Sequence, residues 1–198
     1  MKLCSTTLAA LLLAGNADAT VLTFNTDPFA GSTALTTPGR QIVGGEPSVT
    51  FDPATDALAF DAAVFNLSLP LTFANGPAAS LPASGVNAIV LQEFPATFNA
   101  GLAANAIAAQ ITTPGAGLFI YFNTGLDLAR LVYSTDLDDP TADLSILARF
   151  TNLSGQTGRD AFAGFSADNF QPLPEPSTIL LSGIAALSLL AARRLQRS

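Results

Sequence analysis

Four aspartates within eight residues form the segment of the chain whose spacing best suits metal binding. They are Asp136, Asp138, Asp139 and Asp143. Hard cations take several oxygen ligands, and Ca²⁺ is the usual one outside the cell. The segment lacks the ligand spacing and the central glycine of an EF-hand loop. Two interpretations stay open: a calcium site, or a solvated acidic loop in which Asp139-Pro140 and Asp143 form turns.

Carboxylates elsewhere in the chain could in principle support glycoside hydrolysis. That reaction needs only two carboxyl groups, roughly 5–9 Å apart. Glu46 and Glu93, each with some aspartate, are the candidates. Sugar-cleaving sites normally also offer aromatic platforms, but tryptophan is absent and the chain has only two tyrosines beside its phenylalanines. We therefore expect no enzyme, and a carboxylate-based glycan hydrolase is the alternative.

Missing residue types exclude several other chemistries. The chain has no histidine, and its one cysteine, Cys4, precedes residue 20. A Ser-His-Asp triad is therefore impossible, and residues 20–198 offer neither a catalytic thiol nor a Cys or His zinc site. Gly44-Gly45 is not a phosphate loop, because the Walker lysine and the Rossmann glycine spacing are both missing.

The charge of residues 20–173 is strongly negative. Thirteen acidic residues stand against four basic ones, which gives a net charge of −9. The basic residues are Arg40, Arg130, Arg149 and Arg159. Such a chain has no cationic surface to neutralise phosphates, so we expect no nucleic-acid partner. The acidity is typical of a soluble secreted surface.

Short apolar runs broken by glycine and proline predict strands in the first half of this region. We expect strands at Val21–Phe24, Ser48–Phe51, Ala57–Phe60, Val64–Leu69 and Ala88–Leu91. A helix should follow over Asn99–Ile111, because its alanines favour helix and Asn99 suits the N-cap. Leu102, Ala106 and Ala109 lie near one face of that helix.

An antiparallel meander is expected next, with strands at Leu118–Asn123, Leu128–Thr135 and Leu144–Asn152. The many short strands predict a mostly β fold, a β-sandwich or jelly-roll-like single domain with one short helix. Because a helix lies between two strands, an α+β layout is the alternative. No clear internal repeat is present.

The N-terminus has the layout of a secretory signal peptide. Lys2 supplies one positive charge, and Leu8–Ala14 forms an apolar run too short to span a bilayer. Ala17 and Ala19 then match the small-x-small pattern that signal peptidase accepts, which predicts cleavage after Ala19.

The C-terminus combines three features in a fixed order. Pro174-Glu175-Pro176 comes first, then the uncharged run 179–192, and finally Arg193, Arg194 and Arg197. As a helix, the run is about 21 Å long, and adding Ser177 and Thr178 makes a short membrane span feasible. The arginines favour a cytoplasmic end, which places the preceding domain outside, in agreement with the signal peptide.

This ending resembles the PEP-CTERM sorting signal of Gram-negative bacteria over about the last 25 residues. The stretch from Ser134 to Gly155 is also similar to a block found in uncharacterised proteins that carry that signal. The resemblance implies processing near Pro174–Pro176 by an exosortase and delivery from the inner membrane to the cell surface or beyond. It also implies an association with exopolysaccharide and biofilm.

The expected organisation follows from these signals. It comprises a signal peptide (1–19), a β-rich exported domain (20–168), a linker with the Pro-Glu-Pro motif (169–176), a transmembrane sorting helix (177–192) and a basic cytoplasmic tail (193–198). We expect a non-enzymatic surface or extracellular-matrix protein. Signal peptidase and exosortase should process it, and the inner membrane should hold it before processing. Exopolysaccharide is the expected binding partner outside the cell.

Overall fold

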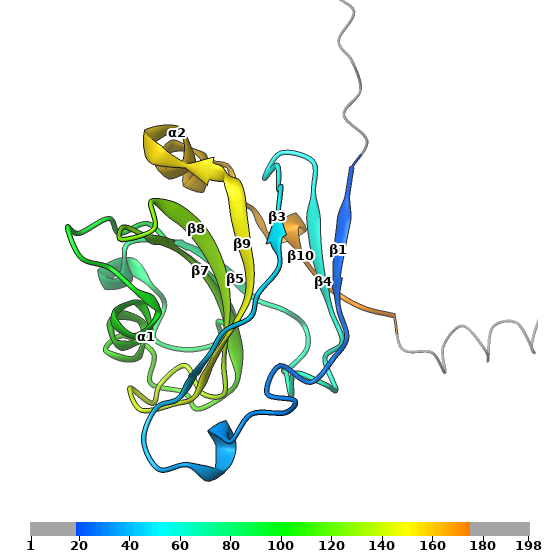
Figure 1. Ribbon diagram of the computed structural model, residues 1–198, viewed down its shortest axis with the longest axis vertical. Helices are drawn as coiled ribbons and strands as arrows, with labels where there is room; N and C mark the ends of the chain where they lie inside the picture. Colours follow the sequence, from blue (N-terminus) through cyan, green and yellow to red (C-terminus); the bar gives the residue numbers. More distant parts are fainter. Residues whose placement is uncertain (1–18, 175–198) are drawn as a thin grey trace, which may run out of the picture.

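The computed structural model describes residues 19–174, which form two β-sheets and a small number of short helices (Figure 1). The smaller sheet has three strands in the order β1-β4-β10, and all of them run parallel. Its strands are β1 (Val21–Phe24), β4 (Ala57–Phe60) and β10 (Phe170–Pro172). The first and last strands of the described chain therefore flank the same central strand.

The larger sheet has seven strands in the order β2-β9-β8-β7-β6-β5, and β3 also pairs with β9. Strands β7, β8 and β9 form the antiparallel meander, and β5, β6 and β7 run parallel to one another. The bounds are β2 (Ile42–Val43), β3 (Ser48–Val49), β5 (Phe73–Gly76), β6 (Ala88–Leu91), β7 (Gly117–Asn123), β8 (Leu128–Ser134) and β9 (Leu144–Ser154).

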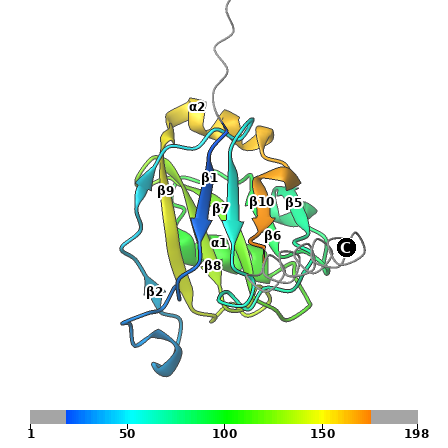
Figure 2. The same cartoon turned by 90° about the vertical axis from the view of Figure 1, so that its right-hand side faces the viewer.

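Helical segments connect and cover these strands. Among the described residues the α-helices are α1 (Ala100–Ala108) and α2 (Gly155–Asp160). The 3₁₀ turns are η1 (Ala34–Thr36), η2 (Ala78–Ser80), η3 (Ala161–Gly164) and η4 (Ala167–Asn169). In Figures 1 and 2 the small sheet lies over one face of the large sheet, and α1 lies over the other face.

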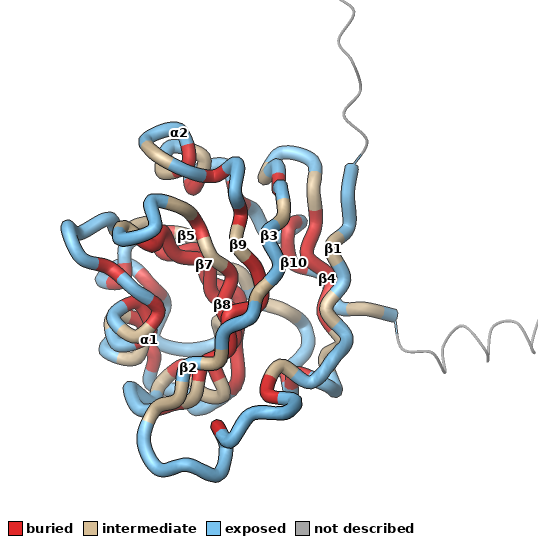
Figure 3. Tube along the Cα trace, in the orientation of Figure 1, coloured by how far each residue is buried: buried red, intermediate tan, exposed pale blue. Residues whose placement is uncertain are grey.

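Two hydrophobic clusters fill the spaces between these layers. In β7, Leu118, Ile120 and Phe122 point into the cluster between the sheets, whereas Phe119 and Tyr121 point into the cluster under α1. All seven residues of β7 are buried, and Figure 3 shows the burial concentrated in the central strands. A strand covered on both faces has a continuous apolar sequence, which is what LFIYF provides.

The predicted sheet-rich class, the meander, and the strands at Val21–Phe24, Ala57–Phe60 and Ala88–Leu91 are confirmed. The jelly-roll topology is not observed, because six of the eight strand pairs among the described residues are parallel. A jelly roll consists of antiparallel Greek keys. The parallel unit β5-β6-α1-β7 instead adds an α/β feature to the antiparallel meander.

The predicted helix is confirmed, but its buried face differs from the expected one. Asn99 is the N-cap, and its side chain accepts a hydrogen bond from the backbone N–H of Leu102. Leu102 itself is 43% exposed. The residues that face the sheet are Ala100, Ala103, Ala104 and Ile107. Small alanines let the helix backbone lie close to the sheet, and Ile107 fills the remaining volume.

The strand predicted over Val64–Leu69 is wrong. The Asp61 side chain accepts hydrogen bonds from the N–H groups of Ala63 and Val64, and this folds the chain into turns. Asn66 has a φ of 47°, a left-handed conformation that asparagine tolerates better than most residues. Phe65 and Leu67 are nevertheless buried. The alternating pattern therefore comes from two side chains that pack into the core from a turn, and not from a pleated strand.

The linker expected from Asn169 begins later than predicted. Phe170–Pro172 forms β10, and the N–H of Leu173 donates to the carbonyl of Phe60 at 2.7 Å. The buried Asn169 donates to the carbonyls of Pro53 and Asp56. The folded domain thus reaches Pro172 and does not end at Asp168.

The predicted signal peptide core and transmembrane helix lie outside the described residues. Within residues 19–174, no helix has the length and apolar character needed to cross a membrane.

Phe60 joins the small sheet to the main core, which makes it the most informative position for a test of packing. Its fully buried ring stacks on the ring of Phe24, with the two ring centroids 5.1 Å apart. It packs edge-to-face with Phe65, with the centroids 5.9 Å apart. We expect Phe60→Ala to lower the free energy of unfolding by about 3–5 kcal/mol, because it leaves a cavity. Urea denaturation measures this change.

Leu35→Ala is the control for this loss of apolar surface. Leu35 is 65% exposed, so its truncation should change the free energy of unfolding by less than about 0.5 kcal/mol. Equal losses for the two variants would contradict the described core.

Candidate functional site

Three of the four aspartates of the predicted calcium segment accept hydrogen bonds from backbone N–H groups, and the fourth, Asp138, donates its own N–H to Asp136. Asp136 accepts from the N–H of Gly115 at 2.8 Å, and Asp143 accepts from the N–H of Gln41 at 2.6 Å. One oxygen of Asp139 accepts from both the N–H and the hydroxyl of its near neighbour Thr141 at 2.7 Å. Each of these three carboxylates therefore fixes a different segment of the chain, and only Asp139 does so locally.

These carboxylates do not converge on one point. Within residues 19–174, no three acidic side chains gather where they could hold a metal ion. The hydrogen bonds from the backbone and the hydroxyl of Thr141 lower the pKa of Asp139. The geometry favours the acidic-loop interpretation for Asp139, which orders a turn through Thr141. Asp143 instead binds the distant backbone of Gln41 and forms no such turn.

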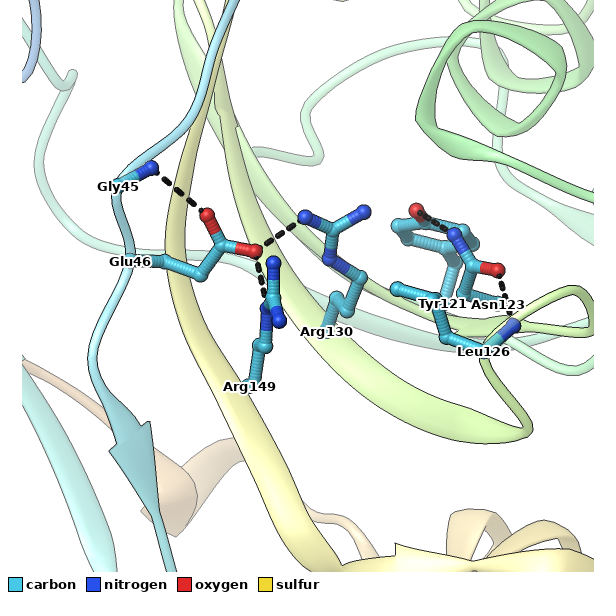
Figure 4. A network of polar contacts seen from close by, with 7 residues as sticks. All are labelled: Gly45, Glu46, Tyr121, Asn123, Leu126, Arg130 and Arg149. Carbon is cyan, nitrogen blue, oxygen red and sulfur yellow. Dashed lines mark hydrogen bonds and ion pairs between the residues drawn. The ribbon is translucent and has the colours of Figure 1, made fainter.

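A different carboxylate, Glu46, lies at the centre of the main ionic network (Figure 4). One of its oxygens accepts from Arg130 and also from Nε of Arg149, the latter at 2.5 Å. The other oxygen accepts from the N–H of Gly45 at 2.9 Å. The Glu46 side chain is only 2% exposed, against 12% for Arg130 and 42% for Arg149.

The strand register explains why the network forms. Arg130 on β8 and Arg149 on β9 are directly opposite each other in the antiparallel ladder, so their side chains share one face of the sheet. Like charges in that position repel. The segment 44–47 joins β2 and β3, which both pair with the outer side of β9, and it brings the Glu46 carboxylate to the two guanidinium groups.

Glu46 is ionised at all ordinary pH values. Burial alone raises the pKa of a carboxyl group, but here hydrogen bonds outweigh it. The donors are Arg149, the backbone N–H groups of Glu46 and Gly45, and Arg130, and they lower the pKa of Glu46 to about 2. A general acid for glycoside hydrolysis needs a raised pKa, so Glu46 is unsuited to that role.

Glu93, the other proposed hydrolase carboxylate, lies elsewhere. It accepts from the N–H of Ala78 at 2.7 Å and so orders the start of η2. Glu93 follows β6, whereas Glu46 lies beyond β9, and three strand steps separate these strands. That corresponds to about 14 Å across the sheet, beyond the spacing at which two carboxylates flank a glycosidic bond.

The other two arginines of the domain also make internal contacts. Arg40 donates to the carbonyls of Ala142 and Gly101 and to the side chain of Asn105, which ties the segment before β2 to α1. Burial lowers the pKa of Arg40, and the nearby aspartates partly offset this. Arg159 pairs with Asp127 at 2.8 Å and lies over the ring of Phe122.

Two clefts open on the described surface. One, of about 250 Å³, lies at the start of β5, β6 and β7 and is lined without any charged side chain. The other, of about 390 Å³, lies between β1 and the 43–47 segment, with Asp27 and Glu46 as its charged residues. Burial and the charge of Asp27 raise the pKa of the nearby Tyr133 to about 12. Asp27 and Glu46 are the two carboxylates among the lining residues of the larger cleft, and the low pKa of Glu46 argues against its serving there as a general acid.

The predicted processing residues fall at the two limits of the structure. Ala19 and Pro174 are described and exposed. The remaining predicted sorting residues lie outside the described chain: Ala17, Glu175, Pro176, Arg193, Arg194 and Arg197.

Searches among family models, curated proteins and solved structures found no match for this chain.

Sequence reasoning missed the network around Glu46. Glu46 was considered as a catalytic carboxylate, and the arginines only as part of the charge balance. The usable signal was the predicted meander, which carries just two arginines, Arg130 and Arg149. Two cations on adjacent strands of a buried sheet require an anion, and one of the domain's two glutamates supplies it.

We expect Glu46→Gln to lower the free energy of unfolding by about 2–3 kcal/mol near neutral pH. The Glu46 pKa is depressed from 4.5 to about 2 in the folded state. Its contribution is therefore complete above about pH 5 and is lost as the pH falls through about 2. Urea denaturation of both proteins across this range should show the difference between them shrinking with falling pH.

Asp127→Asn is the matched control, because the Asp127 side chain in its ion pair with Arg159 is 58% exposed. Exposed pairs contribute about 0–1 kcal/mol. A Glu46→Gln variant no less stable than Asp127→Asn would contradict a buried ionic centre.

Calcium provides a second test of the acidic loop. Because three of its four carboxylates accept from backbone donors and no three acidic side chains gather among the described residues, we expect no change in Tm when calcium is added or chelated. Asp136→Ala should lower the Tm equally with and without calcium, because it removes the acceptor for Gly115. A calcium-dependent rise in Tm that Asp136→Ala abolishes would restore the metal-site interpretation.

Proposed function

We propose that this chain is an exported, non-enzymatic surface or matrix protein, a sandwich-like domain carried between a removable signal peptide and an exosortase sorting signal. The observation that carries the proposal is the order of features at the C-terminus. Pro174-Glu175-Pro176, an uncharged run and three arginines follow one another directly. The signal peptide pattern at the other end specifies the same topology independently.

The layout of the folded domain supports this proposal. Within residues 19–174, the first strand starts at Val21, two residues after the predicted signal peptidase site, and the last ends at Pro172, two residues before Pro174. Both hydrophobic clusters are built from residues between Phe29 and Phe170. The described core therefore does not draw on either processing site, and cleavage at both would leave it intact.

Surface charge supports a role in water outside the cell. All four arginines of residues 20–173 are engaged within the fold, whereas most of the thirteen acidic residues have no basic partner among the described residues. The resulting anionic surface favours solubility. The association with exopolysaccharide rests on the resemblance at the C-terminus.

The proposal predicts two cuts that intact-mass spectrometry can locate. Protein recovered from a Gram-negative host that contains the exosortase should start at Thr20 and end near Pro174. In a strain without exosortase, the same protein should retain its C-terminal arginines. The variant Glu175→Ala should behave in the first strain as the unchanged protein does in the second.

The processed protein then allows the matrix role to be tested. It should be retained on immobilised exopolysaccharide from the host and should release no reducing ends from it. A chain that keeps its C-terminus in both strains would contradict exosortase sorting, and release of reducing ends would replace the structural role with hydrolysis.

A further inference from the structure

Strand β1 has one main-chain edge that no described strand covers. The carbonyls of Thr20 and Phe24 accept from the N–H groups of Ala57 and Asp61 on the β4 side. Alternate residues of a strand direct their main-chain groups to opposite edges. Val21, Thr23 and Asn25 therefore direct their N–H and C=O groups away from β4, and β1 is the terminal strand in the order β1-β4-β10.

The remaining edges of the two sheets are unsuited to strand addition. The β10 and β5 edges lie next to each other (Figure 2), and the ring centroids of Phe73 and Phe170 are 5.7 Å apart. Each edge therefore blocks access to the other. The opposite edge of the large sheet consists of the two-residue strands β2 and β3, which are interrupted by Gly44, Gly45 and Pro47. Glycine and proline at an edge impede pairing.

The β1 edge has the opposite character. Residues 20–26 (TVLTFNT) contain no glycine, proline or charged residue, although the domain as a whole is strongly acidic. Val21 is 54% exposed, and Thr23 is also exposed. The cleft of about 390 Å³ runs beside Thr23 and Phe24 and leaves space next to the strand. Natural proteins usually protect such an edge with charge or proline.

We propose that β1 pairs with β1 of a second copy of this chain, in antiparallel orientation about a twofold axis at Thr23. The two small sheets would then form one continuous sheet, β10-β4-β1-β1-β4-β10. The open main-chain groups are symmetric about Thr23, so Thr23 would face Thr23 of the second copy and Val21 would face Asn25. This arrangement satisfies the open groups at all three positions.

The absence of charged side chains along residues 20–26 lets a second copy approach this strand. Two anionic domains repel each other, and an interface between them needs a neutral strip. Residues 20–26 provide that strip. An isologous interface needs a self-complementary patch, and antiparallel pairing of identical strands is self-complementary by construction. The arrangement uses described residues only and does not depend on export.

Two substitutions at Thr23 test the pairing by sedimentation velocity on the protein as recovered from the host. Thr23→Pro removes an N–H that points away from β4, so the fold should persist while the second copy loses a donor. Thr23→Lys places two positive charges opposite each other on the axis. Both variants should halve the mass observed for the unchanged protein. Thr33→Lys adds the same charge at an exposed turn and should leave the mass unchanged.

Cysteine cross-linking locates the axis. In a Cys4→Ser background, Thr23→Cys should form a disulfide-linked dimer, and Thr33→Cys should not. A monomeric unchanged protein, or a dimer that survives both Thr23→Pro and Thr23→Lys, would overturn the proposal. Circular dichroism identifies any variant that fails to fold. If Thr23→Pro does not fold, the mass of Thr23→Lys and the Thr23→Cys cross-link decide whether β1 pairs with a second copy. Failure here would leave the proposed sorting untouched, because the two are measured on different parts of the chain.

Discussion

The whole fold depends on covering both faces of the central strands β7, β8 and β9. Every residue of β7 is buried, so the large sheet needs two separate covers. One is local: α1 connects β6 to β7 and packs on the sheet that it joins. The other, the small sheet, is assembled from distant parts of the chain, because Leu58 on β4 is opposite both Leu22 on β1 and Phe170 on β10.

Charge inside this sheet is compatible with the fold only because it is balanced. Arg130 and Arg149 are cross-strand neighbours, and removing either cation would leave Glu46 less compensated in a site where its side chain is 2% exposed. Breaking a buried ionic group is costly, although replacing all its members with apolar residues is often neutral. The network therefore holds residues 44–47, the segment between β2 and β3, against β9. This contact keeps both short strands in register with β9.

Local signals were enough to predict the elements that form from local sequence. Asn99 before an alanine-rich run predicted α1, and the apolar run within Leu144–Asn152 predicted most of β9. Elements created by tertiary pairing were missed: FANG in β5 and FQP in β10 have poor strand propensity, yet Phe73 and Phe170 find partners in the core. The turn at Asn66 was missed for the opposite reason, since Asp61 overrides an apolar alternation. The Glu46 network needed the register between strands, which sequence spacing alone does not specify.

The assembly of the small sheet also constrains when the domain can fold. Phe170 pairs with Leu58, far away in sequence, and β10 ends just before Pro174. Such non-local pairing forms slowly, because loop closure precedes any gain from contacts. The cover over the inter-sheet cluster is therefore incomplete until the residues adjoining the proposed sorting motif are available. Under the proposed export, this order would let the last strand close the core only after the rest of the domain has crossed the membrane.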